Sequence, residues 1–302
     1  MTVFQSYDDG NRLEDVEQLV LQLSPTDTPF TSGMMRTKAN NTYHEWPEDT
    51  LAARGDNAVV EGSSFSYGSL SAPSRIFNVT QILDKTYQVS STEGWVKGAG
   101  INDMFIYQES KALLELTNDV EHAFIRGSRA TGNASTARRL AGAINFISTN
   151  ATTVASGTKL TESFFNGLQE LCWDQGGEVD EVYVGARLKR VISSYTANQT
   201  KNVAGDDKRL VNAVDVYESD FSIVKIFKSR DIPSTTNSDA TCLFVDSAKN
   251  RMAIGEPTRI LSRDEVAQTG HGTNGVIRTE KTLEVKAERH QAVAIGLDTS
   301  FV

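Results

Sequence analysis

The chain has 302 residues, of which 39% are hydrophobic and 23% charged, as in a folded protein with a sizeable core. Its formal net charge of −9 argues against a surface that binds polyanions over the whole molecule, although a local contact with nucleic acid stays open. No stretch approaches the ~20 apolar residues of a membrane-spanning helix, and the N-terminus lacks the features of a secretory signal. We therefore expect a protein without membrane contact that is cytosolic when made.

Residues 1–40 are predicted to form an arm rather than a domain. A short amphipathic helix is expected near its start, with one apolar face made by Leu13, Val16, Val20 and Leu23. The prolines at positions 25 and 29 favour an extended path after it.

Residues 42–90 predict a long two-stranded hairpin. Between residues 77 and 89, five apolar residues fall on odd positions and five polar residues on even positions, which is the period of a half-exposed strand. The apolar ones are Phe77, Val79, Leu83, Tyr87 and Val89, and the polar ones Asn78, Thr80, Asp84, Thr86 and Gln88. Its expected partner runs from Thr42 to about Leu51, and glycines and serines fill the tip between them. A ribbon with so few large apolar residues needs another surface to lie on, and another subunit could supply it.

Asn102 and Asp103 are predicted to cap a helix that runs to about Arg126, a rod of about 35 Å, because apolar residues recur along it at 3.6-residue spacing. Residues 122–161 then contain no Asp or Glu but carry five basic residues: Arg126, Arg129, Arg138, Arg139 and Lys159. Their small neighbours predict a mobile loop. It could be solvated or could contact an acidic neighbouring subunit. Nucleic-acid binding ranks third, because no aromatic residues interleave with the arginines.

The rest of the chain predicts an α+β domain. Helices are expected around residues 164–172 and 188–195, and the Gly176–Gly177 pair is predicted to end the first of them. Strands are expected at 179–184, 211–227, 242–246, 251–254 and 283–297. Cys172 and Cys242 are interpreted as two buried, small apolar residues, with a disulfide left open.

The sequence shows no convincing catalytic, cofactor or metal motif. His44 and its neighbour Glu45 lie on a predicted strand, so they face opposite sides and cannot act on one metal or as an acid–base pair. No HExxH pattern, phosphate loop, nucleophile elbow or complete dinucleotide fingerprint is present. We therefore predict no enzyme activity. A hydrolase with a dispersed site that uses His44 or His122 is the alternative.

Several phrases occur in a fixed order along the first half of the chain: SPTDTPF (24–30), NTYHEW (41–46), DTLAA (49–53), NAVVEG (57–62), NVTQI (78–82) and ARRLAGAINFI (137–147). In this combination the sequence resembles a family of major capsid proteins of tailed bacteriophages. The resemblance is densest over residues 24–147 and mostly architectural after them.

The resemblance implies an α+β, HK-ninety-seven-like phage capsid fold. Its expected parts are an N-terminal arm (1–40), an extended E-loop hairpin (41–92), a peripheral domain (93–159) with a spine helix (102–126), an axial domain (160–270), and C-terminal strands (271–302) that return to the core. The implied function is structural: self-assembly into hexamers and pentamers of an icosahedral shell that encloses the phage genome. Another virion component and an encapsulin-like shell are alternatives.

The implied partners are other copies of the chain, scaffolding, portal and decoration proteins, and packaged double-stranded DNA, bound on the inner face without sequence specificity. The implied location is the virion capsid, assembled in the host cytoplasm. Ten residues are candidate contacts between subunits: Tyr43, Trp46, Glu48, Arg54, Phe65, Tyr67, Arg126, Arg129, Arg138 and Arg139.

Overall fold

The computed structural model describes residues 24–299, except residues 66, 69, 97–100, 102, 156, 196–214, 235–238, 262–265 and 269. The helix expected at residues 13–23 lies outside this part. The chain divides into two compact units. The first unit combines Met1–Thr26, Asp84–Leu116 and Ile260–Ile277, and the second combines Asp27–Leu83, Thr117–Arg259 and Arg278–Val302.

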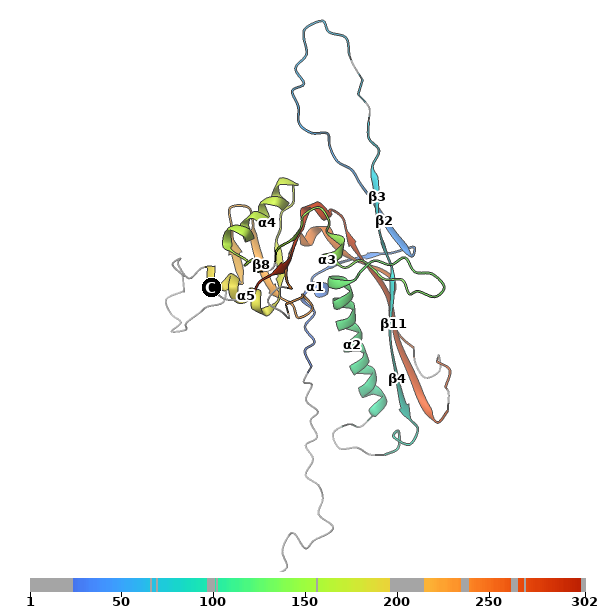
Figure 1. Cartoon of the computed structure of the whole chain (residues 1–302). Coiled ribbons are helices and arrows are strands. Elements are labelled where there is room, and N and C mark those ends of the chain that lie inside the picture. Colours follow the sequence, from blue (N-terminus) through green and yellow to red (C-terminus); the bar gives the residue numbers. More distant parts are fainter. Residues whose placement is uncertain are drawn as a thin grey trace, which may run out of the picture. The chain divides into compact units, whose positions relative to one another are not determined.

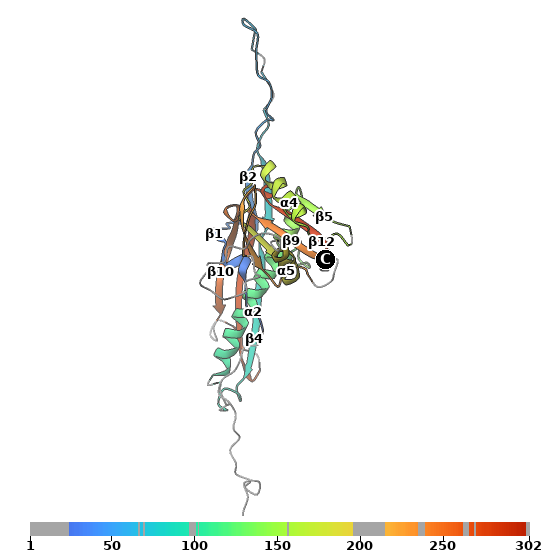
Figure 2. The same cartoon turned by 90° about the vertical axis from the view of Figure 1, so that its left-hand side faces the viewer.

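Helices and strands alternate irregularly along the chain, as the predicted α+β class requires (Figures 1 and 2). The helices are α1 (Pro29–Ser32), α2 (Met104–Arg126), α3 (Ala143–Phe146), α4 (Glu162–Asp174) and α5 (Ala186–Tyr195). The strands are β1 (Met35–Lys38), β2 (Tyr43–Glu48), β3 (Ser74–Val79), β4 (Gln81–Ser90), β5 (Ala151–Thr153), β6 (Glu181–Val184), β7 (Val216–Glu218), β8 (Ile223–Lys228), β9 (Ala240–Val245), β10 (Asn250–Leu261), β11 (Gly272–Val285) and β12 (Ala292–Leu297).

The core of the second unit is a six-stranded sheet in the order β5-β12-β9-β6-β8-β7. Every residue of β9 is buried, as expected for a strand in the centre of the sheet, and all of them except Thr241 are apolar. Helices α4 and α5 place Phe165, Leu168, Leu188 and Ile192 in the same buried cluster. Cys172 and Cys242 lie in this cluster as free cysteines, which confirms that both are buried apolar residues.

Local signals set the ends of α4. The hydroxyl of Thr161 accepts a hydrogen bond from the Phe164 backbone N–H at 3.2 Å and so caps the first turn. At the other end Gly176 has a φ of +85°, and the Gly177 N–H donates to the Cys172 carbonyl. A glycine adopts this conformation without strain, so the chain leaves the helix there, as predicted from the Gly176–Gly177 pair.

A second sheet has the order β1-β10-β11-β4. In the first unit, the Tyr87 hydroxyl donates to Glu109 at 3.0 Å, and the Tyr87 ring lies 5.0 Å from the Phe105 ring. A Cβ on Gly275 would lie 2.3 Å from the Tyr87 ring, so a side chain at that point of β11 would displace the ring. Helix α2 begins one residue after Asp103, whose carboxylate accepts from the Phe105 N–H at 2.8 Å, as predicted for a capping residue.

The structure corrects the predicted hairpin. The long strand expected from Phe77 to Val89 is broken at Thr80: β3 pairs antiparallel with β2, whereas β4 lies beside β11 in the four-stranded sheet. The alternation holds within β4, but Asn78 and Thr80, which occupy polar positions of the pattern, are fully buried. Both side chains bond to distant segments, and the strand pattern did not show these contacts.

The structure also corrects the expected path of residues 24–40. Pro29 begins helix α1 instead of continuing an extended arm, and β1 pairs in parallel with β10. In the second unit, the buried carboxylate of Glu121 accepts hydrogen bonds from the Phe30 and Thr31 N–H groups, both at 2.8 Å. Burial raises the pKa of Glu121 despite these bonds. The stretch from Phe30 to Lys38 is therefore part of the folded unit.

Candidate assembly surfaces

The hairpin β2–β3 ends in a long connection, residues 49–73, that we call the distal loop (Figure 1). Six residue pairs join the two strands, from Tyr43 opposite Val79 to Glu48 opposite Ser74. Beyond them the described residues of the distal loop form no strand or helix, and all of them are exposed. The loop is therefore held at its base alone.

The distal loop presents large apolar side chains to solvent. Phe65 and Tyr67 are 91% and 94% exposed. Four further apolar residues are at least 80% exposed: Leu51, Val59, Val60 and Leu70. Single exposed apolar residues are ordinary, but a series of them along one projecting segment marks an interaction surface. The candidate contacts Phe65, Tyr67 and Arg54 all lie on this surface.

The base of the hairpin is fixed inside the second unit. Trp46 is only 6% exposed, and its ring stacks on Phe146 with the centroids 5.8 Å apart. His44 Nε2 lies 2.9 Å from Glu284 Oε2 on β11. The Trp46 ring therefore packs against the chain's own core, and its side chain offers little surface to a neighbouring subunit.

The buried side chain of Asn78 makes four hydrogen bonds to the backbone at this base. Its Nδ2 donates to the Ala141 carbonyl at 3.0 Å and to the Leu283 carbonyl at 2.8 Å. Its Oδ1 accepts from the Val79 and Ala141 N–H groups at 2.9 and 2.8 Å. Sequence reasoning missed this residue, because one asparagine in an alternating strand carries no signal of burial.

Two candidate contacts, at the two ends of β2, remain partly exposed to solvent. Tyr43 is 42% exposed and lies against Phe77, with the ring centroids 5.8 Å apart. Glu48, at the end of β2, is partly buried, and burial raises the pKa of its carboxyl. Glu45 and Arg75 form an exposed pair with 3.7 Å between Oε2 and Nη1, which contributes little to stability.

The basic segment after α2 is folded back on itself as a small hairpin, in which Ala130 and Arg139 exchange backbone hydrogen bonds. The Arg129 guanidinium lies 4.6 Å from the centre of the Phe77 ring, so Phe77 contacts both Arg129 and Tyr43. Arg138 pairs with Glu280 at 2.9 Å.

The other two arginines of this segment behave differently. Arg126 donates from Nε to the Asp231 carbonyl, whereas Arg139 has an exposed side chain. Arg129 and Arg139 are thus the arginines of this segment that are open to another molecule. Arg126 and Arg138 are tied mainly to their own unit.

The groups suggested for a dispersed hydrolase do not come together. His44 is paired with Glu284, and His122 Nδ1 lies 3.2 Å from Asp231 Oδ1 on a different part of the second unit. Burial raises the pKa of the Cys172 thiol to about 12, so it is a poor nucleophile. Within the described ranges, no cluster of three or more His, Cys, Asp or Glu could hold a metal ion. No helix among those described is long and apolar enough to cross a membrane.

Comparison with known proteins finds a family match over nearly the whole chain and a curated relative over part of it. A family model described as SU10 major capsid protein matches residues 1–298. The major capsid protein of Escherichia phage Phieco32 is 35% identical over 131 residues, which is 43% of this chain and 37% of that relative. The matched part therefore spans little more than a third of the relative's length.

Solved structures share the fold at low sequence identity. A structure from Mycobacterium phage Ogopogo is 12% identical with a TM-score of 0.64, covering 97% of this chain and 99% of that one. The holo-SrpI encapsulin complex from Synechococcus elongatus PCC 7942 is 9% identical with a TM-score of 0.56, covering 94% of both chains. The fold is that of HK-ninety-seven-type capsid proteins, which confirms the expected fold class.

Proposed function

The chain belongs to the family of SU10 major capsid proteins, and from this premise we propose that its copies assemble into hexamers and pentamers of an icosahedral shell around a phage genome. The observation that carries the proposal is the distal loop, a projecting segment with large apolar side chains and no partner within the described chain. Contact with a neighbouring subunit would remove these side chains from water, which stabilises the assembled state by about 25 cal/mol for each Å² buried.

We assign the parts of the chain in the same terms. Residues 1–40 contain the N-terminal arm, which would end before α1, and residues 41–92 contain the E-loop hairpin, formed by β2, β3 and the distal loop. Residues 93–159 would be the peripheral domain, 160–270 the axial domain and 271–302 the C-terminal strands. The hairpin β2–β3 with its distal loop supports the E-loop assignment. Helix α2 supports the assignment of the spine helix, and the six-stranded sheet with α4 and α5 supports that of the axial domain.

The proposed contacts between subunits are Arg54, Phe65 and Tyr67 on the distal loop, with Tyr43 and Glu48 at the hairpin base and Arg129 and Arg139 on the basic hairpin. Arg126 and Arg138 would assist by holding that hairpin in place. Scaffolding, portal and decoration proteins are the further proposed partners, and packaged double-stranded DNA would meet the inner face. The proposed site of assembly is the host cytoplasm.

Deletion of Gly55–Leu70 tests this function, because it removes five of the six exposed apolar residues and leaves β2 and β3 intact. The expected result is a subunit that still unfolds cooperatively but forms no shells in negative-stain electron microscopy. A variant of full length, with a glycine–serine sequence in place of Gly55–Leu70, is the matched control for loop length. It should also fail to assemble. Shells of normal size from the deletion variant would contradict the assignment of the distal loop.

A further inference from the structure

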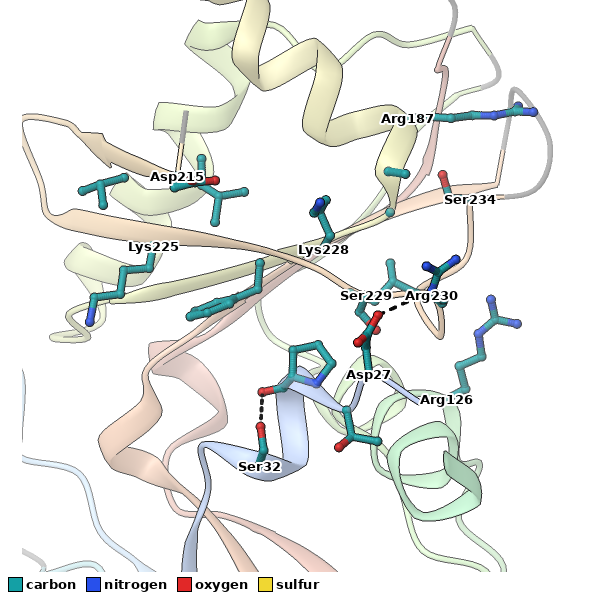
Figure 3. Close-up of a pocket in the computed structure, with 18 residues that line it drawn as sticks. Asp27, Ser32, Arg126, Arg187, Asp215, Lys225, Lys228, Ser229, Arg230 and Ser234 are labelled. Carbon is teal, nitrogen blue, oxygen red and sulfur yellow. Dashed lines mark hydrogen bonds and ion pairs between the residues drawn. The ribbon is translucent and has the colours of Figure 1, made fainter. Parts of the chain in front are cut away.

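A groove of about 950 Å³ in the second unit gathers basic side chains from several elements (Figure 3). It lies between α1, the start of α5 and strand β8 with the turn that follows. Its lining includes two acidic residues, Asp27 and Asp215, and five basic ones: Arg126, Arg187, Lys225, Lys228 and Arg230. Such an excess of positive charge is local, because the whole chain carries a net charge of −9.

Both carboxylates of the groove already have cationic partners. Asp27 Oδ2 lies 3.8 Å from Arg230 Nε, and the pair is exposed and therefore weak. Asp215 Oδ1 lies 3.1 Å from Nζ of Lys189, a buried lysine that is not among the groove's lining residues. The exposed Lys225 and Lys228 are not held by either pair. The groove therefore keeps a positive field that its own acids do not neutralise.

The start of α5 adds donors to this field. Gly185 precedes the helix, and a Cβ there would lie 2.4 Å from Ser234 Cβ, so the lack of a side chain lets Ser234 approach. The Oγ atom of Ser234 is buried and has no hydrogen-bond partner in the described part of the chain. The first backbone N–H groups of a helix also lack partners within the helix and carry partial positive charge. Figure 3 shows Ser234, Lys228, Arg187 and Arg230 around this point.

We propose that this groove binds phosphate groups of a nucleic-acid backbone and is the surface through which the subunit meets the packaged genome. The inference rests on the proposed function, which places a phosphate polymer beside every copy of the chain. Arginine, lysine, hydroxyl and helix N-terminal donors are the groups that proteins use for phosphate. A groove of this volume is larger than one phosphate ion needs, so it suits a polymer.

An acidic segment of another copy is the competing occupant. The distal loop carries Asp49, Asp56 and Glu61, but Arg54 and large apolar residues lie among them. A nucleic-acid strand brings one negative charge for each nucleotide and binds through basic side chains at any sequence. The charge of the groove therefore favours nucleic acid over the loop.

The test measures binding of a fluorescently labelled DNA duplex to the full-length chain by anisotropy, at several salt concentrations. The variant is Lys228→Glu. The matched control is Lys38→Glu, an exposed residue on β1 outside the groove, which changes the net charge equally. We expect wild-type affinity to fall as salt rises. Lys228→Glu should weaken binding by about 5–10-fold at low salt and reduce the slope of log affinity against log salt by about 1. Lys38→Glu should change affinity less than about 2-fold, because Lys38 contacts no phosphate in the proposal.

Three results would overturn the inference. Equal loss in both variants would show that net charge, not the groove, governs binding. Displacement of the duplex by pyrophosphate at equal phosphate concentration would show a site for small anions. Unchanged duplex binding with loss of shells in Lys228→Glu would show that the groove contacts another subunit. Electron microscopy of the same samples separates this inference from the proposed function, since wild-type chain that binds DNA but forms no shells contradicts only the function.

Discussion

Asn78 joins β3 to the Ala141 backbone and to the end of β11, so its loss should destabilise the subunit itself. The change Asn78→Ala removes the hydrogen-bond partner of three buried backbone groups: the Leu283 carbonyl, the Ala141 carbonyl and the Ala141 N–H. We expect the free energy of unfolding to fall by at least about 3 kcal/mol, since three buried groups lose this partner and each costs about 1–3 kcal/mol. Urea unfolding of the unassembled chain measures it.

Asn133→Ala is the matched control. The Asn133 side chain accepts hydrogen bonds from the Ser135 and Thr136 N–H groups in an exposed turn, where water can replace it. Its loss should cost less than about 1 kcal/mol. Equal costs in the two variants would contradict the structural role given to Asn78.

The His44–Glu284 pair should make the unfolding free energy of the subunit depend on pH in the acidic range. Burial acts to raise the pKa of Glu284, but the hydrogen bond and charge of His44, with Lys286 and Arg251, hold that pKa below its usual value. Because the folded pKa lies below the unfolded one, the ionised carboxyl contributes stability above about pH 4.3, and this contribution is lost as the pH falls through the folded pKa.

Glu284→Gln removes this titration. Between about pH 5 and pH 3, the unfolding free energy of the wild type should therefore fall more steeply than that of the variant. The comparison uses the difference between the two chains at each pH, so that all other carboxyl groups cancel. Parallel curves would show that the pair adds no stability.

The partner of His44 lies 240 positions along the sequence, so no local pattern could predict it.

At the scale of elements, the sequence predicted what is set locally. The 3.6-residue apolar period and the Asp103 cap located α2, and the Gly176–Gly177 pair located the end of α4. The break between β3 and β4 was not predictable in this way, because it depends on which strand each half pairs with: β2 for one and β11 for the other. The alternation of apolar and polar residues predicts which face of the sheet each side chain lies on, but not which strand pairs with it.

Gly142 marks a close approach of two elements. A Cβ at this position would lie 2.6 Å from the Gly127 nitrogen and 2.7 Å from the Ile125 carbonyl carbon, both backbone atoms at the end of α2. Gly142→Ala should therefore force the segment before α3 away from α2 and lower the unfolding free energy by about 1–3 kcal/mol. A Cβ on Gly167, inside α4, would meet no atom within 4 Å in the described part of the chain outside the backbone of its own helix and its chain neighbours. Gly167→Ala should raise stability by about 0.5–1 kcal/mol. Thermal unfolding of both variants checks these opposite signs, and a shift in the same direction would contradict the packing described here.

At the scale of the whole molecule, the sequence located the projecting hairpin but not which of its aromatic residues are free. Trp46, Phe65 and Tyr67 look alike in sequence as large residues in one polar segment. The structure separates them, because Trp46 stacks on Phe146 while Phe65 and Tyr67 are almost fully exposed. That difference depends on α3, which lies about a hundred residues downstream, so the local pattern could not contain it.

Phe65→Ser with Tyr67→Ser should separate folding from assembly. The unfolding free energy of the subunit should stay within about 0.5 kcal/mol of the wild type, because both side chains are already exposed. The protein concentration needed for shells should rise at least tenfold, since burying one such side chain is worth about 1.5–3 kcal/mol and about 1.4 kcal/mol is a factor of ten. Light scattering against protein concentration measures the concentration needed for shells.

Trp46→Ser is the contrasting variant: it should lower the stability of the subunit by about 3–5 kcal/mol before assembly begins. If the double variant assembled at the wild-type concentration, the distal loop would not be the surface that joins one subunit to the next.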